Sequence, residues 1–401
     1  MTRDFGFVIV GGGILGSALA ALAAGMGLEP LILRRSDADA PEADTLRNQG
    51  WLQSGIMYPI NHFADESAYR TFAAQTFMAG RDLLKMCGLP VPEEGGLLGL
   101  REAFHVEQLA RKRDLLRLSP YEFHQIEAAD AKRMMGAHYE VGSTYYRIPD
   151  APFNEAAVLR HFRNDAIRHG AIFVEVAQPA RLERRADDVK ITFEGREIVS
   201  PTVVVTAGAG SFGLMEQCGL ALEGELQRTP LVVGEAPADM PAPILVDLGR
   251  GFSAVRHERG DALAPAVVMG TRTKHRHAGP PVRVIPRADQ EEFATLIPPA
   301  FQASMAGGRF TAGYEVMPKR ETGVSAYEPW IRPEGPVIFA SPGRATVSAL
   351  AAQQLLAAVL HRKAEGHGRT GMVDTADCRA WDHPIAMHYM PTYSFNDAEV
   401  Q

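Results

Sequence analysis

Residues 7–16 read FVIVGGGILG, a short apolar run that ends in three consecutive glycines, with a fourth glycine three residues further on. The apolar run Phe7–Val10 predicts a buried strand, and the alanine-rich stretch Ser17–Gly25 predicts a helix. A second apolar run, Pro30–Leu33, predicts the next strand. Strand, glycine turn, helix and strand in this order are typical of the βαβ unit that opens a dinucleotide-binding domain.

The glycine positions carry the chemical part of this prediction. Gly11 permits the tight turn, Gly13 lets the backbone approach a pyrophosphate, and Gly16 lets the helix pack closely on the strand. The N-terminus of the helix then faces the phosphates, where free N–H groups and the helix dipole stabilise negative charge. We count Ile14, inside this turn, among the expected cofactor contacts.

The end of the second strand departs from the usual pattern. An Asp or Glu about twenty residues after the glycines normally binds the ribose hydroxyls, but this chain has Arg34 and Arg35 there. One interpretation is that Arg34 or Arg35 stacks on an adenine or meets solvent. The other is that these side chains bind a 2′-phosphate, which would make the ligand NADP. The first turn alone leaves both interpretations open.

Composition and charge limit the function classes. The chain has 401 residues, enough for two domains, and its formal net charge of -7 offers no basic surface to nucleic acid or to an anionic membrane. Three widely spaced cysteines suggest neither a disulfide framework nor a zinc site, and His275 and His277 have no third ligand nearby. Glycines interrupt the only N-terminal apolar run. We therefore expect a cytoplasmic protein without a membrane span or a metal, acting on a small molecule.

The rest of the chain alternates between βα units and antiparallel segments. Helices are predicted over Glu66–Met86 and Val106–Leu116. A strand over Thr144–Ile148, a helix from Asn154 to His169 and a strand over Ile172–Val176 predict a further βαβ unit. The remaining predicted elements are antiparallel strands in Ala180–Ile198, a strand in Thr202–Thr206, strands in Leu231–Met269 with a hairpin at Arg256–Asp261, a strand in Val337–Ala340 and a helix from Val347 to Val359.

These patterns predict an α/β fold with two interleaved domains. A Rossmann-type domain is assigned to residues 1–86, 150–215 and 331–365. An α+β substrate domain built on an antiparallel sheet is assigned to residues 87–149 and 216–330. Residues 366–401 form a C-terminal extension to which the pattern assigns no role.

Three further segments carry a resemblance to a known family. Residues 47–58 (RNQGWLQSGIMY), 203–211 (VVVTAGAGS) and 341–346 (SPGRAT) are similar, in this order, to flavin-contacting loops of the D-amino-acid oxidase superfamily. That superfamily of FAD-dependent oxidoreductases includes glycine and sarcosine oxidases, glycerol-3-phosphate dehydrogenase and 2-hydroxyglutarate oxidase. The resemblance covers the chain to about residue 362 and implies that the cofactor is FAD.

The resemblance also implies which residues contact FAD. Gly343–Thr346 precede a long helix, so their N–H groups are expected to meet the flavin pyrimidine carbonyl and stabilise charge there. Val176 is expected to contact the adenine through its backbone. The full set of expected contacts is Gly11, Gly13, Ile14, Gly16, Arg34, Arg35, Arg47, Asn48, Gln49, Gly50, Val176, Ala207, Gly208, Gly343, Arg344, Ala345 and Thr346.

Basic residues are the candidates for anchoring an anionic substrate. The stretch Tyr314–Arg320 resembles a strand on which family members carry a basic residue for a substrate carboxylate or phosphate. Lys319 and Arg320 point to opposite faces of a strand, so at most one of them enters the site. Arg344 is a second candidate. The basic stretch Arg272–Arg276 is expected to be a solvated loop, with a lid over the substrate as the alternative.

The general base decides between two reactions. Gln53 stands where the 2-hydroxyglutarate branch of the family has a histidine, and a glutamine cannot accept a proton near neutral pH. Oxidation of an alcohol needs such a base, whereas a free amine can lose hydride by using its own lone pair. We therefore predict oxidation of an amine or amino acid, with oxygen or another molecule accepting the electrons. Tyr58 leaves a 2-hydroxy acid open as the alternative, and an NADP-using monooxygenase would need a second glycine motif that is not visible.

Overall fold

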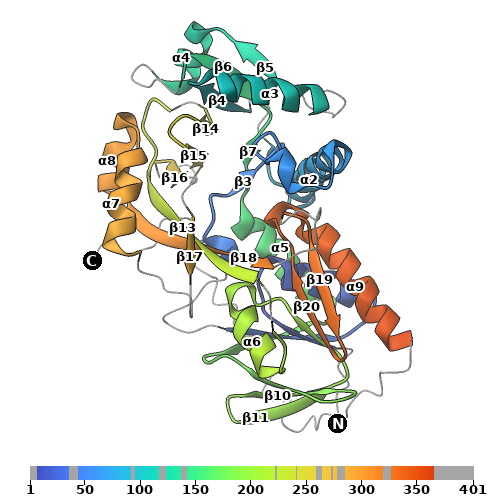
Figure 1. The fold of residues 1–401 in the computed structure, drawn as a ribbon. Coiled ribbons are helices and arrows are strands. Elements are labelled where there is room, and N and C mark those ends of the chain that lie inside the picture. Colours follow the sequence, from blue (N-terminus) through green and yellow to red (C-terminus); the bar gives the residue numbers. More distant parts are fainter. Residues whose placement is uncertain are drawn as a thin grey trace.

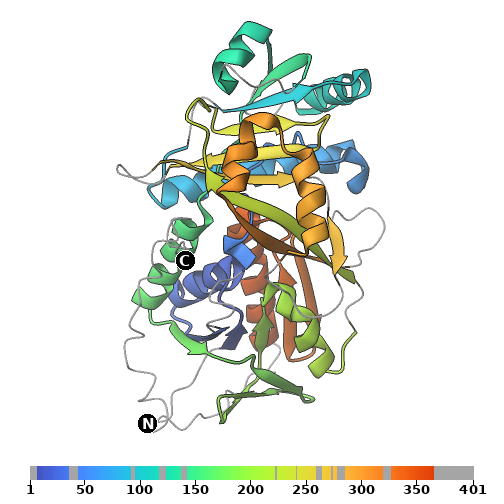
Figure 2. The same ribbon diagram turned by 90° about the vertical axis from the view of Figure 1, so that its left-hand side faces the viewer.

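The computed structural model of the chain describes residues 7–35, 44–91, 95–116, 123–136, 142–221, 224–240, 242–258, 264–271, 274–277, 285–318 and 327–364. Two large sheets organise these residues, one in the lower and one in the upper half of Figure 1. Figure 2 shows the same two halves stacked end to end in the second view. The fold is a mixed α/β fold, which confirms the predicted class.

The lower sheet begins with the strand that precedes the glycines. Its six strands follow the order β19-β20-β12-β1-β2-β8, and neighbours are parallel except for β19 and β20. The strands are strongly apolar because both faces of a parallel sheet are covered. Their bounds are β1 (Phe7–Val10), β2 (Pro30–Arg35), β8 (Ile172–Val176), β12 (Val203–Val205), β19 (Trp330–Glu334) and β20 (Val337–Ser341).

Alternate side chains of β1 enter two different cores. Phe7 and Ile9 pack with apolar residues of helices α1, α5 and α9. Val8 and Val10 pack on the opposite face against helix α6 and a small antiparallel sheet, β9-β10-β11. The bounds are α1 (Ile14–Gly25), α5 (Glu155–Arg168), α6 (Ser211–Gln217), α9 (Ser348–Ala364), β9 (Arg181–Arg184), β10 (Val189–Phe193) and β11 (Arg196–Ser200).

The upper sheet has nine strands and is mostly antiparallel. Eight follow the order β17-β13-β16-β15-β14-β4-β6-β5, and β18 pairs with the other edge of β13. Only the pair β4–β14 is parallel. The strands are β4 (Gly96–Leu100), β5 (His124–Ile126), β6 (Thr144–Ile148), β13 (Gly224–Glu235), β14 (Ile244–Asp247), β15 (Phe252–His257), β16 (Ala266–Thr271), β17 (His275–His277) and β18 (Arg309–Pro318).

Helices cover the upper sheet, and a short two-stranded pair bridges the halves. Apolar residues of α7 and of the turn before α8 pack on β13, β15 and β16. Trp51–Leu52 (β3) pairs with Ala151–Pro152 (β7), which ties the loop after residue 46 to the start of α5. The remaining helices are α2 (Glu66–Met86), α3 (Ala103–Leu116), α4 (Ala128–Met135), α7 (Arg287–Leu296) and α8 (Gln302–Ala306).

Local prediction was accurate for several helices and wrong for one connection. Helix α2 has the predicted bounds, and the Asn154 side chain caps α5 by accepting from the Ala157 N–H at 3.0 Å, as expected of an N-cap. Helix α1 starts at Ile14, three residues earlier than predicted. The expected βαβ unit around α5 is not formed, because β6 lies in the upper sheet and β8 in the lower one. Helix α5 therefore connects the two sheets.

The division into two domains at the predicted boundaries stays a prediction. The predicted C-terminal extension, residues 366–401, lies outside the described residues. The strands do follow the expected interleaving, since the lower sheet draws on residues 7–35, 172–205 and 330–341. None of the described helices combines the length and apolar character needed to cross a bilayer.

Candidate active site

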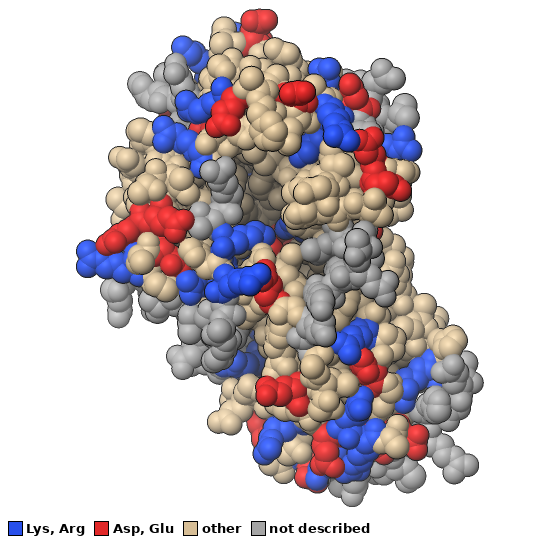
Figure 3. Space-filling view, viewed as in Figure 1, with Lys and Arg blue, Asp and Glu red and all other residues tan. Residues whose placement is uncertain are grey.

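A cavity of about 2550 Å³ runs between the two halves of the protein. Its walls come from the turns that follow β1, β12 and β20, from the loop around residues 45–58, and from β13 and β18. Figure 3 shows one face hollowed between the upper and lower parts, with Lys and Arg side chains gathered nearby. The volume exceeds the roughly 300–1,000 Å³ typical of small-ligand pockets, so the cavity suits an extended ligand together with a substrate.

The glycine turn forms one end of the cavity, and side chains would not fit there. Gly11 has a φ of +121°, and a Cβ on it would lie 2.5 Å from the Thr206 carbonyl carbon. A Cβ on Gly16 would lie 2.0 Å from the Gly11 carbonyl oxygen. The Thr206 hydroxyl donates to that same oxygen at 2.8 Å, and the Ile14 N–H donates to Thr45 Oγ1 at 3.1 Å. The turns after β1 and β12 are therefore locked together around a bare backbone surface.

Two arginines flank this turn. Arg34 packs along Gly12 and pairs with Glu175 of β8 at 3.1 Å. The buried Arg163 of α5 donates to the Gly12 carbonyl oxygen at 2.6 Å. Burial and, secondarily, the charge of Arg34 lower the pKa of Arg163 to about 9, while Glu175 opposes this change. A dinucleotide-binding fold usually has a carboxylate at the end of its second strand, which here is β2. In this protein the carboxylate beside Arg34 is Glu175, on the adjacent strand β8.

The side chain of Asn48 orders the loop around residues 45–58. Asn48 Oδ1 accepts from the Gly50 N–H at 2.6 Å, and Asn48 Nδ2 donates to the Thr45 carbonyl at 2.7 Å. Asn48 also hydrogen-bonds the Glu155 carboxyl. Glu155 is only 7% exposed, and burial raises its pKa to about 8 against the opposing effect of its backbone and Asn48 hydrogen bonds. A carboxyl whose pKa is raised toward neutral pH therefore lies in the cavity wall.

Longer-range hydrogen bonds anchor the same loop to β15 of the upper sheet and to Asp150, which follows β6. The Gln49 side chain donates to the Ser253 hydroxyl of β15 at 3.0 Å. Further on, the Trp51 indole and the Ser54 N–H donate to the two oxygens of Asp150, at 2.8 and 3.2 Å. Burial raises the pKa of Asp150 to about 6, although these bonds act to lower it. The loop is therefore held by hydrogen bonds from the protein itself.

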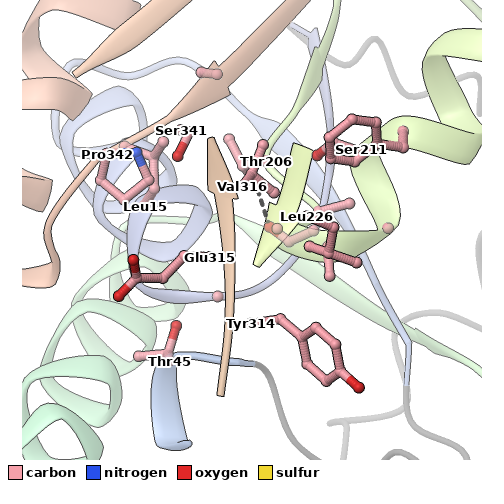
Figure 4. Close-up of a pocket in the computed structure, with 18 of the residues that line it drawn as sticks. Leu15, Thr45, Thr206, Ser211, Leu226, Tyr314, Glu315, Val316, Ser341 and Pro342 are labelled. Atoms are coloured by element: carbon pink, nitrogen blue, oxygen red, sulfur yellow. Dashed lines mark hydrogen bonds between the residues drawn. The ribbon is translucent and has the colours of Figure 1, made fainter. Parts of the chain in front are cut away.

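Charged side chains and aromatic rings form another part of the cavity wall. The Arg344 guanidinium lies 4.3 Å from the centre of the Tyr327 ring and 5.6 Å from that of Tyr58. It also pairs with Glu315 of β18 at 3.6 Å, and the other Glu315 oxygen accepts from Lys274 Nζ at 2.5 Å. Figure 4 shows Glu315 pointing to the opposite side of β18 from Tyr314.

The structure brings most of the predicted site residues to one cavity. Lys319, Arg320 and Arg272 lie outside the described residues. Gly16 and Gly50 stand behind the wall, where each leaves room for a neighbouring group. The predicted residues that line the cavity are Gly11, Gly13, Ile14, Arg34, Arg35, Arg47, Asn48, Gln49, Gln53, Tyr58, Val176, Ala207, Gly208, Gly343, Arg344, Ala345 and Thr346.

Sequence reasoning missed several charged wall residues. Glu155 and Arg163 lie on the buried face of α5 with Val158, Leu159 and Phe162. A charged residue on such an apolar stripe was the available signal, because buried charge is retained where it has a partner or a ligand. In the stretch that contains Glu315, the basic residues Lys319 and Arg320 were chosen as candidates instead. No local sequence pattern pointed to Glu175.

These features match a known family. A family model described as "FAD dependent oxidoreductase" matches residues 7–360. The chain belongs to this family. FAD is therefore the cofactor that the family implies, and the bare glycine turns and the long cavity suit its pyrophosphate and extended shape. The resemblance inferred from residues 47–58, 203–211 and 341–346 is confirmed at the level of the family.

Solved structures of two oxidases and a dehydrogenase share the fold. Glycine oxidase from Geobacillus kaustophilus has a TM-score of 0.68 at 17% identity, over 90% of this chain and 95% of that chain. L-proline dehydrogenase from P. horikoshii scores 0.67 at 16% identity, over 92% and 96%. Iminodiacetate oxidase from Chelativorans sp. BNC1 scores 0.67 at 17% identity, over 88% and 95%. A comparison with curated protein sequences finds no match.

Proposed function

We propose that this FAD-dependent oxidoreductase oxidises the CH–NH bond of a small amino acid or related amine. FAD, when bound, supplies the hydride acceptor at the flavin ring. The observation that carries the proposal is the lack of a strong base at the substrate end of the cavity. Among the described residues that line the cavity there is no histidine and no lysine. Gln53 also lines it, and it stands where the resemblance to the 2-hydroxyglutarate branch of the family implies a histidine.

Glu315 is the acidic side chain at that end, and its surroundings make it a poor base. Burial acts to raise the pKa of Glu315, but attraction to Arg344 and Lys274 outweighs it and holds the pKa below its usual range. An alcohol substrate needs a group that takes its proton as hydride leaves. A free amine supplies its own electron pair, so positioning by the protein is enough.

The charges at this end suit a substrate that also carries an anionic group. Arg344 keeps its charge. Burial acts to lower its pKa, but Glu315, Tyr58 and Tyr327 outweigh this effect, so the pKa is raised overall. Its planar guanidinium suits a carboxylate. Three proteins of the same fold are named as acting on proline, glycine and iminodiacetate, all of which are amines with carboxylates. This likeness supports the proposal for the present chain.

Flavin reduction by matched substrates tests the proposal. An amino acid and its hydroxy analogue are mixed anaerobically with the holoenzyme, and flavin absorbance is followed by stopped flow. Amino acids should reduce the flavin with a rate that rises with pH until the substrate amine is deprotonated. Hydroxy acids should not reduce it. Gln53→His is the informative variant, because a base at this position should admit hydroxy acids.

Two outcomes would contradict the proposal. Faster reduction of the wild type by the hydroxy acid, with Gln53→His leaving that preference unchanged, would show that another group acts as the base. Tyr58, which lies in the same loop, would then be the residue to substitute first. A colourless protein that does not take up FAD would contradict the assignment of the cavity to the cofactor.

A further inference from the structure

The cluster Lys274–Glu315–Arg344 contains two cations and one anion. Arg344 comes from the turn after β20, Glu315 from β18, and Lys274 from the segment just before β17. Glu315 uses one carboxylate oxygen for each cation, at 3.6 Å to Arg344 and 2.5 Å to Lys274. The three side chains are between 23% and 33% exposed. Counted over these three described side chains, the partly buried cluster therefore has a net charge of one positive unit.

We propose that Glu315 is a specificity-determining residue, which cancels one of the two cations so that the site accepts one carboxylate and rejects a second. The substrate class is then an amine with a single carboxylate. Dicarboxylic amines are excluded, including the iminodiacetate for which one protein of the same fold is named. This inference rests on the proposed amine oxidation and adds the charge of the substrate to it.

The geometry of Arg344 shows where the one carboxylate binds. One side of its guanidinium is occupied by Glu315, and its face lies over the Tyr327 ring. Its Nε is buried and has no hydrogen-bond partner within the described part of the chain. A buried donor without a partner is costly unless a ligand satisfies it. A substrate carboxylate at Nε would remove this cost.

The strand explains why Glu315 faces this site. Side chains alternate along β18, so Glu315 projects to the side of the strand where Arg344 lies, while Tyr314 turns to the opposite side (Figure 4). The neighbouring strand β13 carries another cavity-lining acid, Glu225, but among the described residues Glu225 pairs with Arg276, at 2.6 Å, and not with Arg344 or Lys274. Position on the strand, and not acidity alone, gives Glu315 its role.

The experiment compares two acids that cannot be oxidised as amines. Butyrate and succinate both have four carbons and differ by one carboxylate. Their dissociation constants for the FAD-loaded protein are measured at equilibrium from the change in flavin absorbance. The wild type should bind butyrate more tightly than succinate. Glu315→Gln should shift the ratio of the two constants toward succinate by roughly ten- to a hundredfold, the worth of one charge-assisted bond.

Control variants keep the result interpretable. Glu225→Gln removes the same charge from the adjacent strand and should leave the ratio unchanged. Lys274→Met leaves Arg344 and Glu315 to cancel each other, so butyrate binding should weaken by about tenfold. This second variant supports or contradicts the inference even if Glu315→Gln does not fold.

An unchanged ratio in Glu315→Gln would overturn the inference, and so would wild-type protein that binds neither acid or prefers succinate. Failure of the proposed function is distinguishable, because the binding ratio is measured without turnover. A shifted ratio combined with preferential oxidation of hydroxy acids would contradict amine oxidation and leave the charge selection in place.

Discussion

Substituting Glu155 with glutamine should stabilise the apoprotein by an amount that grows with pH. The ordinary pKa of a glutamate is about 4.5, and burial in the cavity wall raises the pKa of Glu155 to about 8. Between these values the folded protein holds a proton that the unfolded chain releases, so stability falls as pH rises. At pH 7 the cost is about 3 kcal/mol, from 1.36 kcal/mol for each of about 2.5 pH units. A glutamine resembles the protonated form and avoids this cost.

Urea unfolding of the apoprotein at pH 5 and pH 7 measures the effect. The stability difference between Glu155→Gln and wild type should be about 3 kcal/mol at pH 7 and under about 1 kcal/mol at pH 5. Glu107→Gln, at an exposed carboxylate of α3, controls for the loss of one charge. A gap of the same size at both pH values would refute the reasoning, since the effect would then not come from the proton. So would a wild type that gains stability relative to the variant as pH rises from 5 to 7.

Two further pairs of substitutions test the glycine turn. Gly16→Ala places a Cβ 2.0 Å from a backbone oxygen and should abolish FAD retention on gel filtration. Gly25→Ala, on the same helix, places its Cβ in open space. This control should keep FAD and gain about 0.5–1 kcal/mol of stability. FAD retained by Gly16→Ala would contradict the packing argument. Arg163→Met removes the donor to Gly12 and should weaken FAD binding by roughly ten- to a hundredfold in a fluorescence titration, while the exposed Arg168→Met should not. Equal affinities for the two variants would show that Arg163 has only a packing role.

The sequence was sufficient to predict the parts of the fold that depend on local pattern. The apolar run before Gly11, the N-cap at Asn154 and the alternation near residues 180–198 act over a few residues, so each can be recognised without the rest of the chain. The loops around the flavin were found because whole segments resemble a family.

The chain connectivity and the charged wall were not predictable in this way. Strand β6 has the same local pattern as a strand of the lower sheet, and only its pairing with β4 assigns it to the upper one. Asp150 binds residues that are nearly a hundred positions earlier, and Glu315 meets Lys274 across the sheet. These contacts depend on tertiary packing, which a single sequence does not encode in any short window.

The order of strands in the lower sheet has a consequence for how the enzyme is made. Val8 pairs with Val203, and Val203 pairs with Val337, so the centre of the sheet joins segments from opposite ends of the chain. The glycine turn is synthesised well before the turn after β20, and both turns line the cavity. The cavity wall is therefore complete only after β20 has joined the sheet. A ligand that binds only the completed wall stabilises the joined sheet by mass action.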